Sequence, residues 1–281
     1  MTTPLVSIAM PFYNAGQTIG ASIASILLQT YTNWELLLCD DGSTDASFDK
    51  ARAFHDPRIT VWGDRQRLQL GARLNECIDR AHGAYIARMD ADDIAYPRRL
   101  ENQVHFLKDR PEIDLAGGWA VLFADAGTPV GKRADPVAHR EIARWPLYSF
   151  KLIHPTFMGK TSWFRHYRYR ADAIRCEDHD LLFRACAHSR FANLPEIVLG
   201  YRQASIDLHK CLRSRRMWCR CAGSYLNTAG ILRVAAVEVL KSCRDVAAVA
   251  TRVDTAWLRI RHPALSTEEL REWRQVWDSV S

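Results

Sequence analysis

Short apolar segments alternate with helical segments along the first 123 residues, and this alternation limits the fold more than any other feature. The apolar runs lie at 5–10, 34–39, 58–62, 84–89 and 113–123. Runs of this length with polar flanks predict buried strands. Apolar residues recur with helical spacing between them, over 17–29, 46–54, 70–81 and 97–108. Strands that alternate with helices in this way predict an α/β fold with a mostly parallel sheet and helices on both faces.

Polar side chains follow three of the predicted strands at the point where each strand ends. These are Tyr13 with Asn14, Asp40 with Asp41, and Asp90 with Asp92. In open α/β sheets the carboxyl ends of the strands form the ligand-binding edge, so we expect a site there. The sequence argues against a dinucleotide or P-loop site, because no GxGxxG follows the first strand. The segment GTPVGK at 127–132 is one residue short of a P-loop and does not join a strand to a helix.

Three carboxylates, Asp90, Asp92 and Asp93, follow the strand predicted over 84–89. If the extended backbone continues, Asp90 and Asp92 point the same way. Two carboxylates this close either take up a proton or share a cation. Mg²⁺ and Mn²⁺ prefer such oxygen ligands and leave positions open for substrate phosphates. A solvated acidic turn at a strand end is the alternative interpretation.

Length and composition favour a cytoplasmic protein with one large domain, or one domain and an appendage. The chain has 281 residues, of which 48% are hydrophobic, and it can bury a full core. No apolar stretch reaches the ~20 residues that span a bilayer, and the N-terminal MTTPLVSIAM has no basic region typical of a signal peptide. The eight cysteines are expected as free thiols, and the absence of CxxC pairs disfavours zinc.

The positive charge belongs to the C-terminal part of the chain. Residues 206–281 hold 13 Lys and Arg against 8 Asp and Glu, whereas the first 205 residues hold 25 against 24. Amphipathic helices are predicted at 231–250, 255–260 and 267–280, the last capped by Ser266 or Thr267 ahead of two glutamates. We therefore expect a basic helical extension over 206–281 that either packs on the first domain or makes peripheral contact with anionic lipid. Nucleic acid is disfavoured as a partner because no recognition motif accompanies the charge.

Four segments carry a resemblance to a known family. They are MPFYN at 10–14, DDGSTD at 40–45, RMDADD at 88–93 with PRRLENQ after it, and CEDHDLLFR at 176–184. In this order and spacing the chain resembles the family 2 glycosyltransferases, most closely their non-processive bacterial members, over about the first 200 residues. The resemblance implies a GT-A (nucleotide-diphospho-sugar transferase) fold for residues 1–205, followed by the helical extension.

The resemblance also implies roles around the nucleotide-sugar donor. Tyr13 resembles the residue that stacks on the base, and Asp41 resembles the carboxylate that accepts a hydrogen bond from the base imide. Such a donor exists in uracil, thymine and guanine and not in cytosine, so UDP is the favoured nucleotide and dTDP or GDP the next. Asp92 would ligate Mn²⁺ or Mg²⁺, and Asp90 would face the ribose or the metal. Further donor-side candidates are Pro11, Asn14, Arg73, Asn75 and Arg202. Arg202 is the positively charged residue expected to reach the diphosphate.

The same resemblance implies the catalytic groups. Asp178 corresponds to the family's general base and Glu177 to a supporting acid, and the apolar spacing after them predicts a helix that starts near Asp178. A single base opposite the leaving group implies inversion. His179 replaces a usual aromatic residue and could titrate near neutrality. His154 lies in a segment that resembles the family's acceptor side, and we include it as a candidate metal ligand.

The function expected from the sequence is inverting, metal-dependent transfer of a sugar to a hydroxyl of a saccharide or lipid-linked saccharide in bacterial surface polysaccharide synthesis. The hypothesis requires Asp41, Asp92 and Asp178 to line one cavity. Sugar contacts are expected from a loop at 124–138, and the absence of Gln-x-x-Arg-Trp favours addition of single residues. A sugar-nucleotide nucleotidyltransferase is one alternative, although its basic Gly-rich N-terminal loop is missing. A non-catalytic nucleotide-sugar binding protein is the other.

Overall fold

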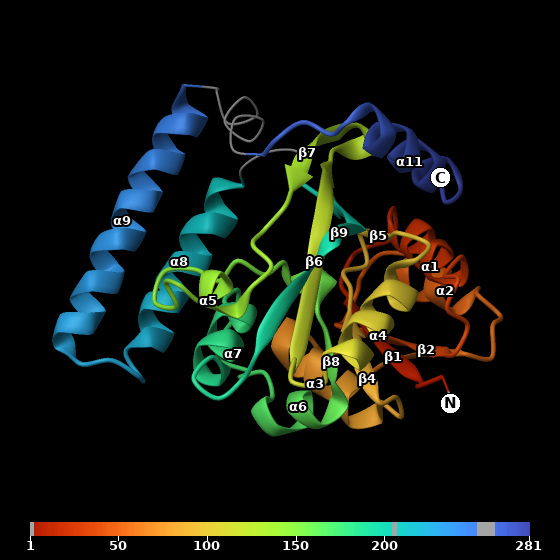
Figure 1. The fold of residues 1–281 in the computed structure, drawn as a ribbon, viewed down its shortest axis with the longest axis horizontal. Helices are drawn as coiled ribbons and strands as arrows, with labels where there is room; N and C mark the ends of the chain where they lie inside the picture. The colour runs from red at the N-terminus through yellow and green to blue at the C-terminus, as the bar shows by residue number, and fades with distance from the viewer. Residues whose placement is uncertain (1–2, 204–206, 252–261) are drawn as a thin grey trace.

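A computed structural model describes residues 3–203, 207–251 and 262–281 (Figure 1). These residues contain a nine-stranded sheet with the order β3-β2-β1-β4-β8-β6-β9-β5, and β7 pairs with β6. The strands are β1 Val6–Phe12, β2 Trp34–Asp40, β3 Ile59–Gly63, β4 Tyr85–Arg88, β5 Ile94–Ala95, β6 Leu115–Phe123, β7 Pro129–Arg133, β8 Met158–Lys160 and β9 Phe191–Arg202. The helices are α1 Ile19–Leu27, α2 Ser47–Arg52, α3 Leu70–Arg80, α4 Arg99–Asp109, α5 His139–Ile142, α6 Thr161–Tyr167, α7 Glu177–Ala185, α8 Leu208–Ala222, α9 Thr228–Ala250 and α11 Thr267–Asp278, with short 3-10 turns η1 Asp125–Gly127 and η2 His154–Thr156.

The N-terminal part of the sheet is parallel, as the alternation predicts. Strand β1 pairs in parallel with β2 and β4, and β2 pairs in parallel with β3. Successive side chains of a strand point to opposite faces, and both faces are covered here. Ile8 and Met10 of β1 join one core with α1 and α4, whereas Ala9 joins a second core with α3 and α6. Burial on both faces explains why these strands appear in the sequence as unbroken apolar runs.

The second part of the sheet is mixed. Strands β6 and β9 pair in parallel from Leu115 opposite Phe191 to Phe123 opposite Arg202, and β7 and β8 pair with β6 in the antiparallel sense. The segment 124–138, expected as a loop, contains η1 and β7. Sequence periodicity gave no sign of β7, because Pro129 and Gly131 are poor strand formers and its order comes from pairing with the edge of β6.

Helix α11 packs on the sheet at the carboxyl end of β6. The Trp273 ring is fully buried, 4.9 Å between centroids from Phe123, and its Nε1 donates to the Gly127 carbonyl at 2.7 Å. A Cβ at Gly200 of β9 would lie 2.3 Å from the Trp273 ring, so only glycine fits at that position. Ser266 and Glu269 form a capping box at the helix start, which confirms the predicted N-terminal boundary.

Helices α8 and α9 form an antiparallel pair on the opposite side of the molecule from α11 (Figure 1). Trp218 of α8 is buried and donates from Nε1 to the Leu147 carbonyl at 2.9 Å. Arg215 of α8 forms ion pairs with two buried carboxylates of α9, Glu238 and Asp245. The predicted domain boundary at 205–206 and the predicted helix at 255–260 fall outside the described residues, and both stay predictions.

All eight cysteines are free thiols. Cys39, Cys77, Cys176 and Cys221 are buried, Cys186, Cys211 and Cys219 are partly exposed, and Cys243 on α9 is exposed. Among the described residues, no helix has both the length and the apolar content needed to cross a bilayer. The cytoplasmic location inferred from the sequence stays a prediction.

Replacement of Trp273 by alanine should destabilise the protein by about 3–5 kcal/mol, because it removes the largest buried contact between α11 and the sheet. Urea unfolding followed by tryptophan fluorescence or circular dichroism measures the change. Arg274→Ala, on the exposed face of the same helix, is the matched control and should stay within about 0.5 kcal/mol of wild type. Equal unfolding midpoints for the two variants would show that α11 does not depend on this contact.

Candidate functional site

A cavity of about 590 Å³ opens at the carboxyl ends of β1, β2 and β4. This is the edge at which the sequence predicts a ligand site. Eight of the predicted site residues line the cavity: Pro11, Tyr13, Asn14, Asp41, Asp90, Asp92, Glu177 and Arg202. We call it the donor cavity, after the nucleotide-sugar donor that the sequence resemblance implies for these residues.

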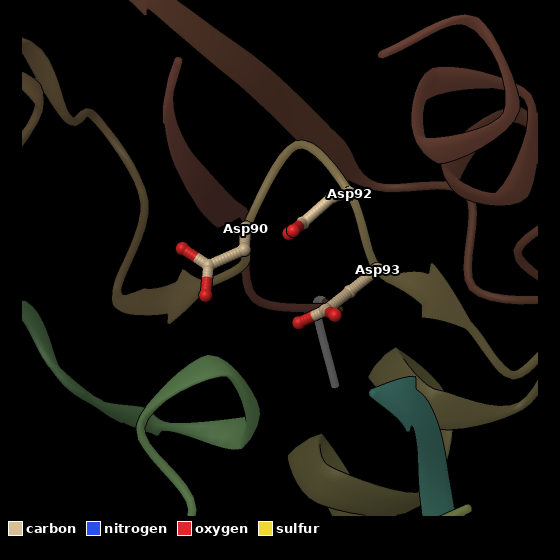
Figure 2. Close-up of side chains that lie close together, drawn as sticks. All are labelled: Asp90, Asp92 and Asp93. Atoms are coloured by element: carbon tan, nitrogen blue, oxygen red, sulfur yellow. The ribbon is translucent and has the colours of Figure 1, made fainter. Parts of the chain in front are cut away.

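The acidic residues of the donor cavity lie on a turn that follows β4. The strand ends at Arg88, so the side-chain alternation expected for Asp90 and Asp92 does not extend to them. The turn itself gathers the carboxylates, and oxygens of Asp90, Asp92 and Asp93 lie within 4.8 Å of one another (Figure 2). The Thr18 hydroxyl, just before α1, donates to the backbone oxygen of Ala91 at 2.9 Å and holds the turn in place.

Crowding of negative charge sets the electrostatics of this turn. Desolvation by the surrounding protein raises the pKa of Asp92 to about 6, and repulsion from Asp90 adds to the shift. Asp93 is fully buried, and burial together with the Asp92 charge raises its pKa well above the usual value. Arg88 offsets part of the charge through two contacts to the Asp90 carboxylate at 2.5 and 2.8 Å. The turn is therefore built to take up a cation or a proton.

Arg202, at the end of β9, borders the acidic turn. Its backbone N–H donates to Asp93 Oδ1 at 2.9 Å, and its Nε donates to the Asp92 backbone oxygen at 2.9 Å. Its Nη1 contacts the exposed Asp125 at 2.9 Å. A guanidinium at this position adds positive charge at the rim of the donor cavity beside the three aspartates.

Tyr13 and Asp41 lie in the donor cavity with different environments. The Tyr13 ring is 36% exposed, and the Arg67 guanidinium lies 3.6 Å from its centroid. Asp41 is buried, and its Oδ1 accepts from the backbone N–H groups of residues 68–69 and from Arg73 Nε at 3.2 Å. Its Oδ2 accepts one contact, from a backbone N–H at 3.2 Å. One carboxylate oxygen therefore keeps capacity for a hydrogen bond from a ligand.

Four predicted site residues do not line the donor cavity: Arg73, Asn75, His154 and Asp178. Arg73 is buried behind Asp41 and forms ion pairs with three carboxylates. The Asn75 amide bonds both backbone groups of Tyr169, at 2.8 and 3.0 Å. His154 Nε2 lies 2.9 Å from the Tyr169 hydroxyl, and burial holds the His154 pKa well below its usual value. Among the described residues, the group that could hold a metal ion consists of Asp90, Asp92 and Asp93, and His154 does not belong to it.

Glu177 and Asp178 begin α7, as the sequence predicts. Glu177 lines the donor cavity, whereas Asp178 lines an adjoining cavity of about 600 Å³. The two cavities share Arg175 and Ser214. The expected single cavity with Asp41, Asp92 and Asp178 is therefore divided in two, because neighbouring residues of a helix point about 100° apart.

The environment of α7 separates the roles of its first residues. Glu177 is buried, and burial raises its pKa. His179 contacts the Pro146 carbonyl through Nε2 at 2.8 Å and stacks on Trp218 with 3.8 Å between ring centroids. Burial lowers the His179 pKa, so this residue favours the neutral form and packs α7 against α8.

Sequence patterns missed several residues that line the donor cavity. Arg67 and Gln69 precede α3, and Arg175 precedes α7. Gln69 and Arg175 adopt positive φ angles of 74° and 66°. Irregular segments of this kind have no periodicity, and only the basic content of 65–67 could have indicated a cavity residue.

Solved structures with the same fold include nucleotide-sugar enzymes. The Staphylococcus aureus TarS 1–349 structure in complex with UDP has a TM-score of 0.61 and 16% identity, and covers 98% of this chain and 79% of that one. The mannosyltransferase PcManGT from Pyrobaculum calidifontis, in complex with GDP-Man and Mn²⁺, has a TM-score of 0.61 and 20% identity and covers 99% of this chain and 85% of that one. These likenesses confirm the GT-A fold.

Sequence comparisons agree with this fold. EpsE of Bacillus subtilis is 36% identical over 209 residues, which are 72% of this chain and 74% of EpsE. The Escherichia coli protein named UDP-Glc:alpha-D-GlcNAc-diphosphoundecaprenol beta-1,3-glucosyltransferase WfgD is 45% identical over 132 residues, 47% of this chain and 51% of WfgD. The profile described as Glycosyl transferase family 2 matches residues 7–172. The chain therefore belongs to glycosyl transferase family 2 and is a glycosyltransferase.

Proposed function

We propose that this glycosyltransferase transfers a sugar from a nucleotide diphosphate, most favourably UDP, to a hydroxyl of a saccharide acceptor, with inversion and with a bound divalent metal. The observation that carries the proposal is the arrangement of α7. Its first residue borders the donor cavity and its second borders the adjoining one. A base at such a boundary can act on an acceptor while the donor lies next to it.

The acidic turn fits Mn²⁺ or Mg²⁺. Carboxylate oxygens are the ligands that these ions prefer, and the three aspartates lie close enough together to share one ion. We assign Asp92 and Asp90 as ligands and Asp93 to the support of Arg202. When bound, the ion would stabilise negative charge on the leaving diphosphate. His154 was a candidate ligand, and its hydrogen bond to Tyr169 favours a structural role instead.

Tyr13, Arg67 and Asp41 suit a nucleotide base. The Tyr13 ring offers an exposed face at the rim of the cavity, and Asp41 Oδ2 can accept from a base N–H. This donor is present in uracil, thymine and guanine. The nucleotides bound in the two structural relatives, UDP and GDP-Man, carry bases of this kind. Pro11 and Asn14 line the same cavity. Arg73 supports it through the ion pair to Asp41, and Asn75 fixes the backbone of Tyr169.

Asp178 is the proposed general base. It would accept the proton of the acceptor hydroxyl as the oxygen attacks the anomeric carbon, on the face opposite the leaving diphosphate. Glu177, whose burial raises its pKa, would support the sugar by hydrogen bonding. Arg202 would hold the diphosphate, because its guanidinium lies at the cavity rim beside the acidic turn.

The adjoining cavity is the proposed acceptor side. Its wall contains Phe150 and Trp218 together with basic side chains, among them Arg133, Arg215 and Lys241, each of which also forms an ion pair with an acidic residue of the chain. Aromatic and basic groups suit a saccharide that carries phosphate. The name of WfgD specifies a sugar on a diphosphoundecaprenol, and we propose a lipid-linked saccharide of bacterial surface polysaccharide synthesis as the acceptor here.

A lipid-linked acceptor calls for membrane contact, and α9 offers a surface for it. Helix α9 lies at the edge of the molecule, with α8 between it and the sheet (Figure 1). Its exposed apolar side chains recur at helical spacing: Leu232, Ala236, Val239, Leu240, Val246 and Ala250. Exposed arginines of α8, at 213, 216 and 220, provide positive charge nearby. This combination suits the inner, anionic face of the cytoplasmic membrane.

Asp178→Asn should lower the transfer rate by about 10²–10⁴-fold and leave UDP affinity unchanged, because it removes the base and keeps the shape of the side chain. Turnover of UDP-sugars with a lipid-linked saccharide and calorimetric UDP binding measure the two effects. Asp172→Asn, at an exposed position before the same helix, is the matched control. Wild-type turnover in Asp178→Asn would contradict the role of this base, and a wild-type chain that binds UDP without turnover of any donor would favour the binding protein.

Mn²⁺ affinity should fall about tenfold for each pH unit below about 6, because protons then compete for Asp92, whose pKa is raised to about 6. The metal-free protein should lose stability as pH rises from about 4 to about 6, because the folded state binds the Asp92 proton more tightly than the unfolded state does. Calorimetric Mn²⁺ titration and thermal melts at several pH values check both. Asp92→Asn should abolish the Mn²⁺ effect, and the exposed Asp109→Asn should keep it. Mn²⁺ binding that persists in Asp92→Asn would remove this residue from the metal site.

Leu232→Glu with Leu240→Glu should weaken binding to vesicles of phosphatidylglycerol and phosphatidylcholine by more than about tenfold, because both side chains would leave the lipid surface. Vesicle co-sedimentation measures the bound fraction. Leu28→Glu, also exposed but next to α1, is the control and should bind as wild type does. Equal binding by all three proteins would exclude the α9 face.

A further inference from the structure

A separate cavity of about 640 Å³ lies beside α11 and shares no residue with the donor cavity. Helix α11 forms one wall, with Glu272, Gln275 and Val276. The other wall comes from the segment between β5 and α4, from α4 itself and from β6 and β9, with Tyr96, Asn102, Trp119 and Glu196. We call this the α11 cavity. Its volume lies in the range typical of small-molecule sites.

Two carboxylates of the α11 cavity have no positive partner. Glu269 pairs with Lys132, and the charge of Arg98 is matched by Glu101. Glu196 accepts only from the neutral Asn102 amide, and Glu272 has no ion pair or hydrogen bond among the described residues. Burial and three neighbouring glutamates raise the pKa of Glu272. The cavity thus carries uncompensated negative charge on a chain whose net charge is +6.

Tyr96 gives an independent sign of a ligand. Its side chain is 3% exposed, and its hydroxyl has no hydrogen-bond partner in the described part of the chain. Tyr96 lines the α11 cavity; burial raises the pKa of its hydroxyl, and the nearby charges of Glu272 and Glu269 add to the shift. A buried hydroxyl without a partner is costly, so such a group is normally satisfied by an ordered water or a ligand.

The ligand class follows from the spacing of the acidic groups and from the walls. Within the described residues, Asp90, Asp92 and Asp93 form the group of three or more possible ligands close enough to hold one metal ion, and the α11 cavity contains no such group. A compact metal ion therefore does not suit it, whereas a longer cation does. The aromatic face of Trp119 and the apolar Pro97, Pro195 and Val276 suit a hydrocarbon chain with a positive end.

We propose that the α11 cavity binds an aliphatic diamine. One ammonium group would contact Glu272 and donate to the Tyr96 hydroxyl oxygen, the other would contact Glu196, and the methylene chain would lie against the apolar wall. The two carboxylates belong to different elements, α11 and β9, so an extended dication can reach both. The site lies outside the proposed transfer machinery, and its test is independent of glycosyl transfer.

Calorimetric titration of the full chain with cadaverine tests the proposal. Wild type should bind one cadaverine and should not bind pentanediol, its uncharged counterpart. Glu272→Gln and Glu196→Gln should each weaken cadaverine binding about tenfold or more, as expected for the loss of a charged hydrogen bond. Tyr96→Phe should also weaken binding while its unfolding midpoint stays at or above that of wild type, since the change removes an unpartnered hydroxyl.

Glu268→Gln is the matched control, because it removes the same charge from the same helix at a residue that does not line the α11 cavity. It should bind cadaverine as wild type does. Equal weakening in Glu268→Gln and Glu272→Gln would show general charge attraction and overturn the proposal. Absence of cadaverine binding or equal binding of pentanediol would overturn it as well. So would equally tight binding of Nα-acetyl-lysine amide, because this compound carries only one ammonium group.

Discussion

Mutual repulsion of three carboxylates on one turn is the constraint around which this structure is built. Asp90, Asp92 and Asp93 lie within a single turn after β4, and their charges would drive the turn open without compensation. Arg88 compensates from the strand itself, and Arg202 compensates from the end of β9. The position of a strand more than one hundred residues later in the chain is thereby tied to the acidic turn.

The pairing of β5 with β9 reinforces that tie. Ile94 lies opposite Gly200, so the segment directly after the acidic turn is hydrogen-bonded to the strand that supplies Arg202. Gly200 has no side chain, and the Trp273 ring of α11 therefore packs directly against its backbone. Helix α11 therefore contributes to the rigidity of the donor side, although it begins far beyond the residues that match the family profile. Packing of this kind keeps charged loops in one geometry.

The first residues of helix α7 border two different cavities. Its N-terminus places Glu177 toward the donor cavity and Asp178 toward the adjoining one, because consecutive helical residues diverge in direction. Helices α8 and α9 then close the second cavity, held by Arg215 and its two buried acidic partners. Residues of α8 and α9 thus form part of the wall of the cavity that contains Asp178.

The sequence by itself determined the strand–helix order through α4 apart from the two-residue strand β5, the edge of the sheet at which the donor cavity opens, the start of α7 and the capped start of α11. Apolar periodicity and capping residues are local signals, and β5 is too short to show such periodicity. The acidic motif was also readable locally. Only the tertiary structure decided that Arg73, Asn75 and His154 lie behind the cavity lining, and that Arg67 and Arg175 lie in it. These placements depend on contacts between segments far apart in the chain and on irregular backbone, which have no periodic signature in sequence.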